Sequence, residues 1–186
     1  MKNIFNELKT KLSKAILHDV KLLLAMYPDK RFYGLNLATD SSCQSVYLAL
    51  SSYEGLQQKA VNENYASTDE MKFLAWFLED VNIDELGENS QINQVSEYLF
   101  YNEDVFHSQY EDQYGEDYFD QYKDDIVAIF CEAFEESAVL ELFDNEIFIC
   151  ISDSESDEKL ENLTSERLNS KEKHQLFLKR FDEWIL

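Results

Sequence analysis

The sequence predicts an α+β fold in which several helices pack on a small, mostly antiparallel sheet. Three observations support this prediction. Apolar residues recur at helical spacing over most of the chain, two runs rich in β-formers flank a polar turn near 32–50, and a third such run lies near 146–152. The length of 186 residues suits one domain, and no internal repeat or linker divides the chain. We therefore expect a single domain over 1–186, with 82–123 resembling an insertion.

An amphipathic helix is expected over about residues 4–27. Its lysines occupy the polar faces, and Pro28 and Asp29 end it. A membrane-surface helix would show the same pattern, but a helix that faces the core explains it equally well. The apolar positions are Ile4, Leu8, Leu12, Ile16, Val20, Leu23, Leu24 and Tyr27.

A β-hairpin is expected next, because Phe32–Ala38 and Ser45–Leu50 flank the polar turn TDSSCQ. Three helices should follow. Ser51 or Ser52 caps the first, and Glu54 lies near the capping-box position. The second is STDEMKFLAWFLEDV, residues 67–81, with acids in its first turn, and the third is Ser90–Tyr101.

The C-terminal half predicts two further helices and one strand. The helical spacing over Tyr118–Leu142 indicates the longest and most hydrophobic helix, which should therefore be central. The run EIFICIS, residues 146–152, predicts a buried strand beside the hairpin, and residues 153–162 predict a polar loop. A final helix is expected over 170–186, with inward-facing Leu176, Phe177, Phe181, Trp184 and Ile185.

Charge is distributed unevenly along the chain. The formal net charge is -22, yet residues 1–50 carry a net +3 and residues 101–186 a net -17. Such a field repels nucleic acid and anionic membranes and attracts basic proteins or divalent cations, so we expect no nucleic acid and no membrane as partner. The three separated cysteines, the lack of a signal peptide and the lack of a membrane span predict a cytoplasmic protein.

Catalytic and metal-binding patterns are weak. His107 is the one histidine among acids, and an ordinary surface role suits it best. The stretch DSESDEKLENLT has the acid spacing of a calcium loop, but Glu158 and Thr164 stand where glycine and glutamate are required. Asp153 is expected to cap the backbone of the loop that leads to Asn169. We therefore predict no catalytic residue, no metal and no cofactor.

Tyrosines and acids alternate in YEDQYGEDYFDQYKDD, residues 110–125. Four tyrosines spaced by four would align on a helix, although Gly115 interrupts it. Tyrosine is a common interface anchor, and unrelieved acids steer a basic partner, so we expect this belt to face outward. A tyrosine stripe at helical spacing is also typical of core. The predicted partner-binding residues are Tyr110, Glu111, Asp112, Tyr114, Glu116, Asp117, Tyr118 and Asp120.

Three pieces of the chain resemble a bacterial family, the domain of unknown function 4303. They are FYGLNLATD, EESAVLELFDNEIFICISDSESDE and SERLNS, and the segment 82–123 departs from the resemblance. The resemblance implies a small immunity-like protein of toxin systems. The matching positions are Phe32, Tyr33, Thr39, Asp40, Ser152, Asp153, Leu168 and Asn169, and Trp76 resembles a family aromatic.

Charge and resemblance together predict a non-enzymatic binding protein, monomeric or weakly dimeric. Its partner would be a basic protein, a cognate toxin whose active cleft, such as that of a nuclease, the acidic surface covers. Two alternatives remain open from the sequence. One is an enzyme that uses a carboxylate-bound divalent metal, and the other is a regulatory subunit that self-associates through its tyrosines.

Overall fold

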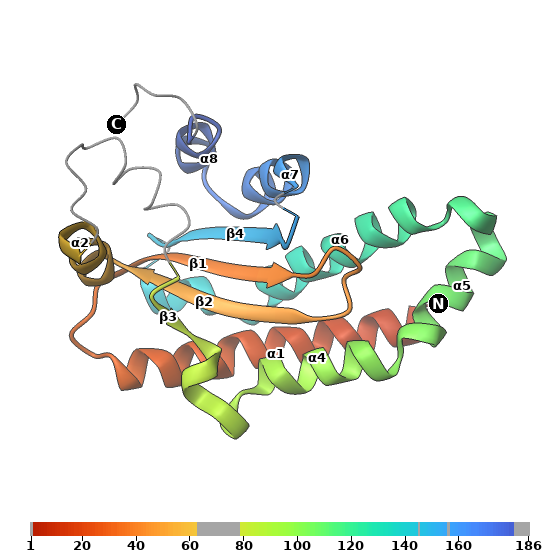
Figure 1. Cartoon of the computed structure of the whole chain (residues 1–186), viewed down its shortest axis with the longest axis horizontal. Helices are drawn as coiled ribbons and strands as arrows, with labels where there is room; N and C mark the ends of the chain where they lie inside the picture. Colours follow the sequence, from red (N-terminus) through yellow and green to blue (C-terminus); the bar gives the residue numbers. More distant parts are fainter. Residues whose placement is uncertain (1, 63–78, 145, 156, 181–186) are drawn as a thin grey trace.

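A computed structural model describes residues 2–62, 79–144, 146–155 and 157–180 (Figure 1). The strands are β1 Phe32–Thr39, β2 Val46–Ser52, β3 Val81–Asn82 and β4 Phe148–Asp153. The α-helices are α1 Lys2–Met26, α2 Tyr53–Asn62, α4 Gln91–Tyr101, α5 Glu103–Tyr114, α6 Phe119–Ser137, α7 Glu158–Leu168 and α8 Lys171–Phe177. Short 3₁₀ helices are η1 Ile83–Asn89, η2 Gly115–Asp117 and η3 Val139–Phe143. The predicted α+β class is confirmed.

The sheet is mixed, whereas the sequence predicted a mostly antiparallel one. Its order is β3-β2-β1-β4; β1 pairs antiparallel with β2, β2 antiparallel with β3, and β1 parallel with β4. Parallel strands need a long crossover, and the helices between β2 and β4 supply it. The direction of β4 therefore depends on the path of this crossover, which the local composition of residues 146–152 does not encode.

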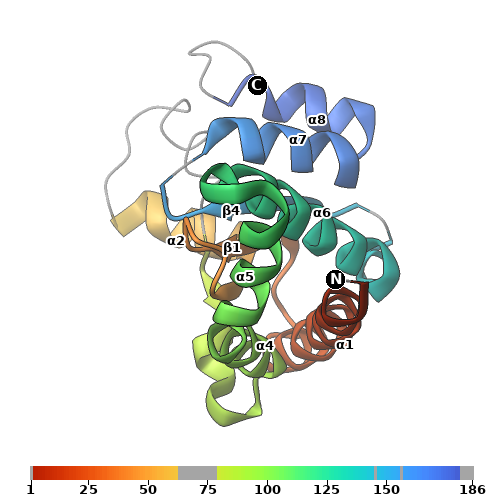
Figure 2. The same cartoon turned by 90° about the vertical axis from the view of Figure 1, so that its right-hand side faces the viewer.

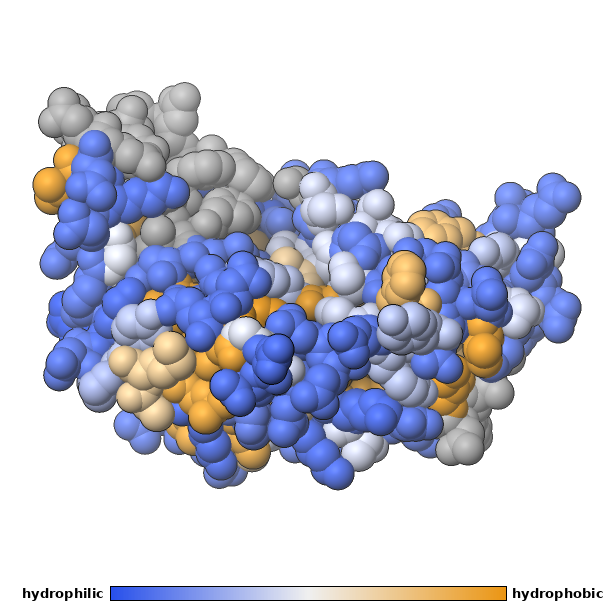
Figure 3. Space-filling view, turned by 60° about the horizontal axis from the view of Figure 1, so that its bottom comes forward, coloured by the Kyte–Doolittle hydropathy of each residue, from blue (hydrophilic) through white to orange (hydrophobic). Residues whose placement is uncertain are grey.

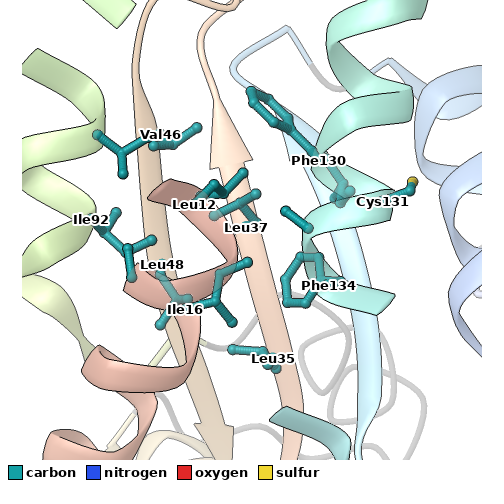
Figure 4. Packing of buried hydrophobic residues seen from close by; sticks show 14 of the residues in the cluster. Leu12, Ile16, Leu35, Leu37, Val46, Leu48, Ile92, Phe130, Cys131 and Phe134 are labelled. Carbon is teal, nitrogen blue, oxygen red and sulfur yellow. The ribbon is translucent and has the colours of Figure 1, made fainter. Parts of the chain in front are cut away.

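Three helices, α1, α4 and α6, cover one face of the sheet (Figures 1 and 2). Figure 4 shows Leu12 of α1, Ile92 of α4 and Phe134 of α6 pointing toward Leu37 and Leu48 of the sheet. Burying each of these large apolar side chains stabilises the fold by about 1.5–3 kcal/mol. On the opposite face, β4 presents Phe148 and Cys150 to Phe177 of α8.

The predicted helix near residues 4–27, the hairpin, the helix after Ser52 and the strand near 146–152 are confirmed. Ser52 caps α2, since its Oγ accepts a hydrogen bond from the Gly55 N–H at 3.0 Å. The N-terminal helix α1, with 25 residues, is longer than α6, with 19, so the expectation that α6 is the longest helix is wrong. Residues 67–78 of the predicted second helix, Trp76 and residues 181–186 lie outside the described residues.

Several helix boundaries differ from the prediction. The final helix ends at Phe177, and residues 178–180 form a turn. The helix expected to reach Leu142 ends at Ser137, because Ala138 adopts a left-handed conformation with φ 56°. The polar loop expected over 153–162 is short, since α7 already begins at Glu158 with Asp157 as its N-cap. In the final helix, Phe177 is buried but Leu176 is exposed, contrary to expectation. None of the helices among the described residues is long and apolar enough to span a bilayer.

Replacing Ala138 by glycine should stabilise the protein. A left-handed conformation costs alanine about 1 kcal/mol and costs glycine almost nothing, so Ala138→Gly should raise the free energy of unfolding by about 0.5–1 kcal/mol. Urea unfolding of the two proteins measures the difference. An unchanged or lower midpoint at equal slope would contradict the assigned cap.

A buried carboxylate joins α1 to the N-terminus of α4. Asp19 of α1 is fully buried, and its Oδ2 accepts hydrogen bonds from the Ser90 hydroxyl at 2.7 Å and the Ile92 N–H at 2.9 Å. Its Oδ1 accepts from the Gln91 N–H at 2.9 Å and lies 2.8 Å from His18 Nδ1. The carboxylate therefore satisfies donors of the first helical turn, where the helix dipole also favours negative charge.

Candidate functional site

A helical corner projects from the end of the molecule farthest from α2. Helix α5 runs outward, the turn at Gly115 and η2 reverses the chain, and α6 returns beside the sheet (Figures 1 and 2). Gly115 adopts φ 75° and ψ -154°, a region essentially restricted to glycine, so α5 ends there as the sequence predicted. The surface of this end is largely hydrophilic in the view of Figure 3.

Six carboxylates are exposed on this corner, and we call them the acidic corner. Among the residues that the structure describes, none of the six forms an ion pair. Like charges at this density repel one another, and their solvent exposure leaves them free to contact a partner. The six are Glu111, Asp112, Glu116, Asp117, Asp120 and Asp124.

The expected outward stripe of tyrosines is wrong. Tyr110 and Tyr122 are 2% and 1% exposed, and their rings pack edge to face at 5.5 Å between α5 and α6. The Tyr110 hydroxyl donates to Asp125 at 2.6 Å, and burial raises the pKa of this phenol. The Tyr118 hydroxyl lies 2.7 Å from His107 Nδ1, which ties the turn to α5. Because the chain reverses at Gly115, the four-residue spacing brings rings from two helices together inside the corner.

Tyr114 is the member of the stripe that stays accessible, at 46% exposure, with its ring stacked on Tyr110. The structure thus supports the acids and Tyr114 as surface residues, places Tyr118 half-buried and removes Tyr110 from the surface. The partner-binding role of the accessible residues stays a prediction.

Sequence reasoning missed an apolar patch at the base of the corner, where α4 meets α5. Phe100 and Tyr101 are 62% and 78% exposed, their rings meet at 5.6 Å, and Val105 is also exposed. We call these three residues the aromatic patch. The helical periodicity contained a signal for it, since Tyr98 and Leu99 pack on the core and residues two positions further on lie on nearly the opposite side of a helix.

A lysine joins α6 to the C-terminal end of β4. Lys123 Nζ donates to Asp153 at 2.8 Å and to Asp157 at 3.2 Å, and Asp153 is buried. Asp153 Oδ1 also accepts hydrogen bonds from the backbone N–H groups of Glu155 and Asp157, so its predicted role as a structural cap is confirmed. Burial lowers the pKa of Lys123, but the two carboxylates outweigh it and the net pKa is raised.

The structure offers little for metal binding at this place. The Lys123 ammonium contacts both Asp153 and Asp157, where a cation ligated by these carboxylates would have to compete with it. The calcium-like stretch forms the start of α7 instead of an open loop. Across the described part of the chain, no group of three or more His, Cys, Asp or Glu is placed to hold a metal ion.

The residues that carry the family resemblance also have structural roles at the sheet. Asp40 closes the hairpin turn by accepting hydrogen bonds from the backbone N–H groups of Ser42 and Gln44, at 2.9 and 3.1 Å. Burial opposes ionisation of Asp40, but these bonds and the Ser45 hydroxyl lower its pKa overall. The family model for the Domain of unknown function (DUF4303) matches residues 12–170. The chain belongs to this family.

The DUF4303 match includes the acidic corner and the aromatic patch as well as the sheet. No curated protein and no solved structure matches the chain. The family has no assigned function, so the function of this protein is inferred below from its own surface.

Asn169, the last residue of the resemblance, closes the outer edge of the sheet in this DUF4303 protein. Its side-chain amide donates to the Ile149 carbonyl at 2.7 Å and accepts from the Ile149 N–H at 2.8 Å, as a neighbouring strand would. Lys173 Nζ and the Thr164 hydroxyl donate to the carbonyls of Ile147 and Ile151 on the same edge. An edge closed in this way does not recruit further strands.

Proposed function

We propose that this DUF4303 protein is a non-enzymatic binding protein whose acidic corner docks on the basic surface of another protein. The observation that carries the proposal is the group of six exposed carboxylates without an ion-pair partner among the described residues. A site of one charge sign raises the local concentration of an oppositely charged partner and accelerates its association.

The aromatic patch gives this surface apolar anchors. Interfaces take most of their binding free energy from a few aromatic or arginine side chains surrounded by polar residues. Phe100, Tyr101 and Tyr114 are exposed rings on the same pair of connected helices, and the carboxylates of Asp104, Glu111 and Asp112 are exposed on α5. This combination suits a partner that is basic with an apolar centre.

The partner class that fits best is a bacterial toxin, which makes this protein an immunity protein. Toxins that cleave nucleic acid need a positive cleft to hold phosphates, and an acidic corner would occupy the same field. The acidic corner then works by covering the cleft, which requires no catalytic group of its own.

The test is affinity capture from the native host at low salt with two proteins in parallel. One is the unmodified chain, and the other carries lysine at positions 111, 112, 116 and 117. A basic protein retained by the first and absent from the second, which then loses its toxic activity when the purified unmodified chain is added, supports the proposal. Identical sets of captured proteins would contradict it.

A second candidate function, self-association through the aromatic patch, is favoured by the exposure of Phe100 and Tyr101. Two acidic surfaces repel each other, so dimerisation would strengthen as salt rises, whereas binding of a basic partner weakens. Sedimentation velocity at low and high salt separates the two functions. A dimer at high salt that Tyr101→Ser abolishes would favour self-association.

A further inference from the structure

A groove of about 520 Å³ lies between α6 and α7, next to the acidic corner. In Figures 1 and 2, α7 lies alongside the first half of α6. The acidic corner adjoins the N-terminal end of α6. Asp120 and Asp124 belong to the acidic corner and also line the groove. The apolar part of its lining comes from Val127, Ala128, Cys131, Leu160 and Leu163.

The charged residues of the groove divide into paired and unpaired groups. Lys123 is engaged by Asp153 and Asp157, and Arg167 forms two bonds of 2.7 Å with Glu135. Among the described residues, Asp120 and Asp124 on α6 have no ion-pair partner. Lys159 of α7 also lines the groove and has no ion pair among the described residues. The unpaired charges are therefore two carboxylates on α6 and one ammonium on α7, which leaves an excess of negative charge on the α6 side beside the apolar side chains.

Part of the apolar lining is accessible to a ligand. Leu163 is 54% exposed although it adjoins Leu160, which is buried. Cys131 points away from the sheet toward α7, and burial raises the pKa of its thiol to about 11, so it lines the groove as a neutral side chain (Figure 4). Covering a leucine of this exposure would contribute on the order of 1 kcal/mol to binding.

We propose that this groove holds a basic amphipathic segment of the partner protein. Asp120 and Asp124 are one helical turn apart, which spaces their carboxylates by about 6 Å along α6. A helix with two Lys or Arg four residues apart matches this spacing, and its apolar residues would cover Leu163 and Val127. The inference rests on the proposed function and adds to it a segment that anchors the partner after the acidic corner has steered it.

The experiment uses two fluorescent 14-residue probe peptides whose leucines recur at helical spacing, so that each forms an amphipathic helix. The polar positions are lysine in one peptide and glutamate in the other. Fluorescence anisotropy should show binding of the lysine peptide and none of the glutamate peptide. Leu163→Glu should weaken binding at least about tenfold by placing a charge in the apolar lining. The double change Asp120→Asn and Asp124→Asn should weaken it by a similar factor while keeping the side-chain shapes.

Leu176→Glu is the matched control, because Leu176 of α8 is an exposed leucine outside the groove. It should change the affinity less than twofold, and circular dichroism should show that all variants fold. Equal affinity of the Leu163→Glu and Leu176→Glu proteins would overturn the groove assignment. If binding instead disappears only on charge reversal at 111, 112, 116 and 117, the groove assignment fails while the proposed function stands. If binding is instead lost in the Leu163→Glu and Asp120→Asn/Asp124→Asn proteins but kept on charge reversal at 111, 112, 116 and 117, the result supports the groove and counts against the role of the acidic corner.

Discussion

Replacement of Asp19 by alanine should lower the free energy of unfolding by about 3–5 kcal/mol. The carboxylate is fully buried and accepts hydrogen bonds from the Ser90 hydroxyl and from the backbone N–H groups of Gln91 and Ile92. Its removal leaves these donors buried without an acceptor at the start of α4, which packs on α1 and β2. Urea unfolding followed by circular dichroism measures the loss.

Two control variants locate the cause of this loss. Asp19→Asn keeps one acceptor oxygen and should lose less stability than Asp19→Ala. Asp29→Ala removes an exposed carboxylate just after α1 and should stay within about 0.5 kcal/mol of the unmodified protein. If Asp19→Ala were as stable as Asp29→Ala, the cap on α4 would not hold the helix as described.

Charge reversal of the acidic corner should slow association with the captured partner by about 10- to 100-fold at low salt. The variant carries lysine in place of Glu111, Asp112, Glu116 and Asp117, which are all exposed, so the stability of the fold should change little. The dissociation rate should change less, since steering acts on the encounter. Surface plasmon resonance separates the two rates.

A second charge-reversed protein controls for net charge. Lysine at positions 29, 88, 141 and 172 replaces four exposed acids that lie outside the acidic corner, the aromatic patch and the helices that carry them, and changes the net charge by the same amount. Its association should slow much less than that of the corner variant. Equal slowing in both proteins would mean that overall charge, and not the acidic corner, governs the encounter.

Much of the fold could be predicted from local pattern. The apolar steps of three and four gave α1, and β-formers on both sides of a polar turn gave the hairpin, because each signal lies within one element. The direction of β4 and the cap from Asp19 to Ile92 depend on residues distant in the chain. The start of α7 was missed because its first turn is acidic and resembles a loop, although Asp157 is a good N-cap.

The candidate site was predicted in part. The exposure of the acids follows from their cost of burial, and the structure agrees. Tyr110 was misplaced because tyrosines at helical spacing occur both in cores and at interfaces. The reversal of the chain at Gly115 folds α5 against α6 and buries Tyr110 between them. Tyr101 was not predicted as an anchor because it lies outside the run in which tyrosines alternate with acids.

The central claim is that the acidic corner meets a basic partner, and the dependence of the association rate constant on ionic strength tests it most directly. Stopped-flow mixing of the unmodified chain with its captured partner should show the rate constant falling at least about tenfold between roughly 20 and 300 mM salt. A rate constant that stays level over this range would contradict the claim.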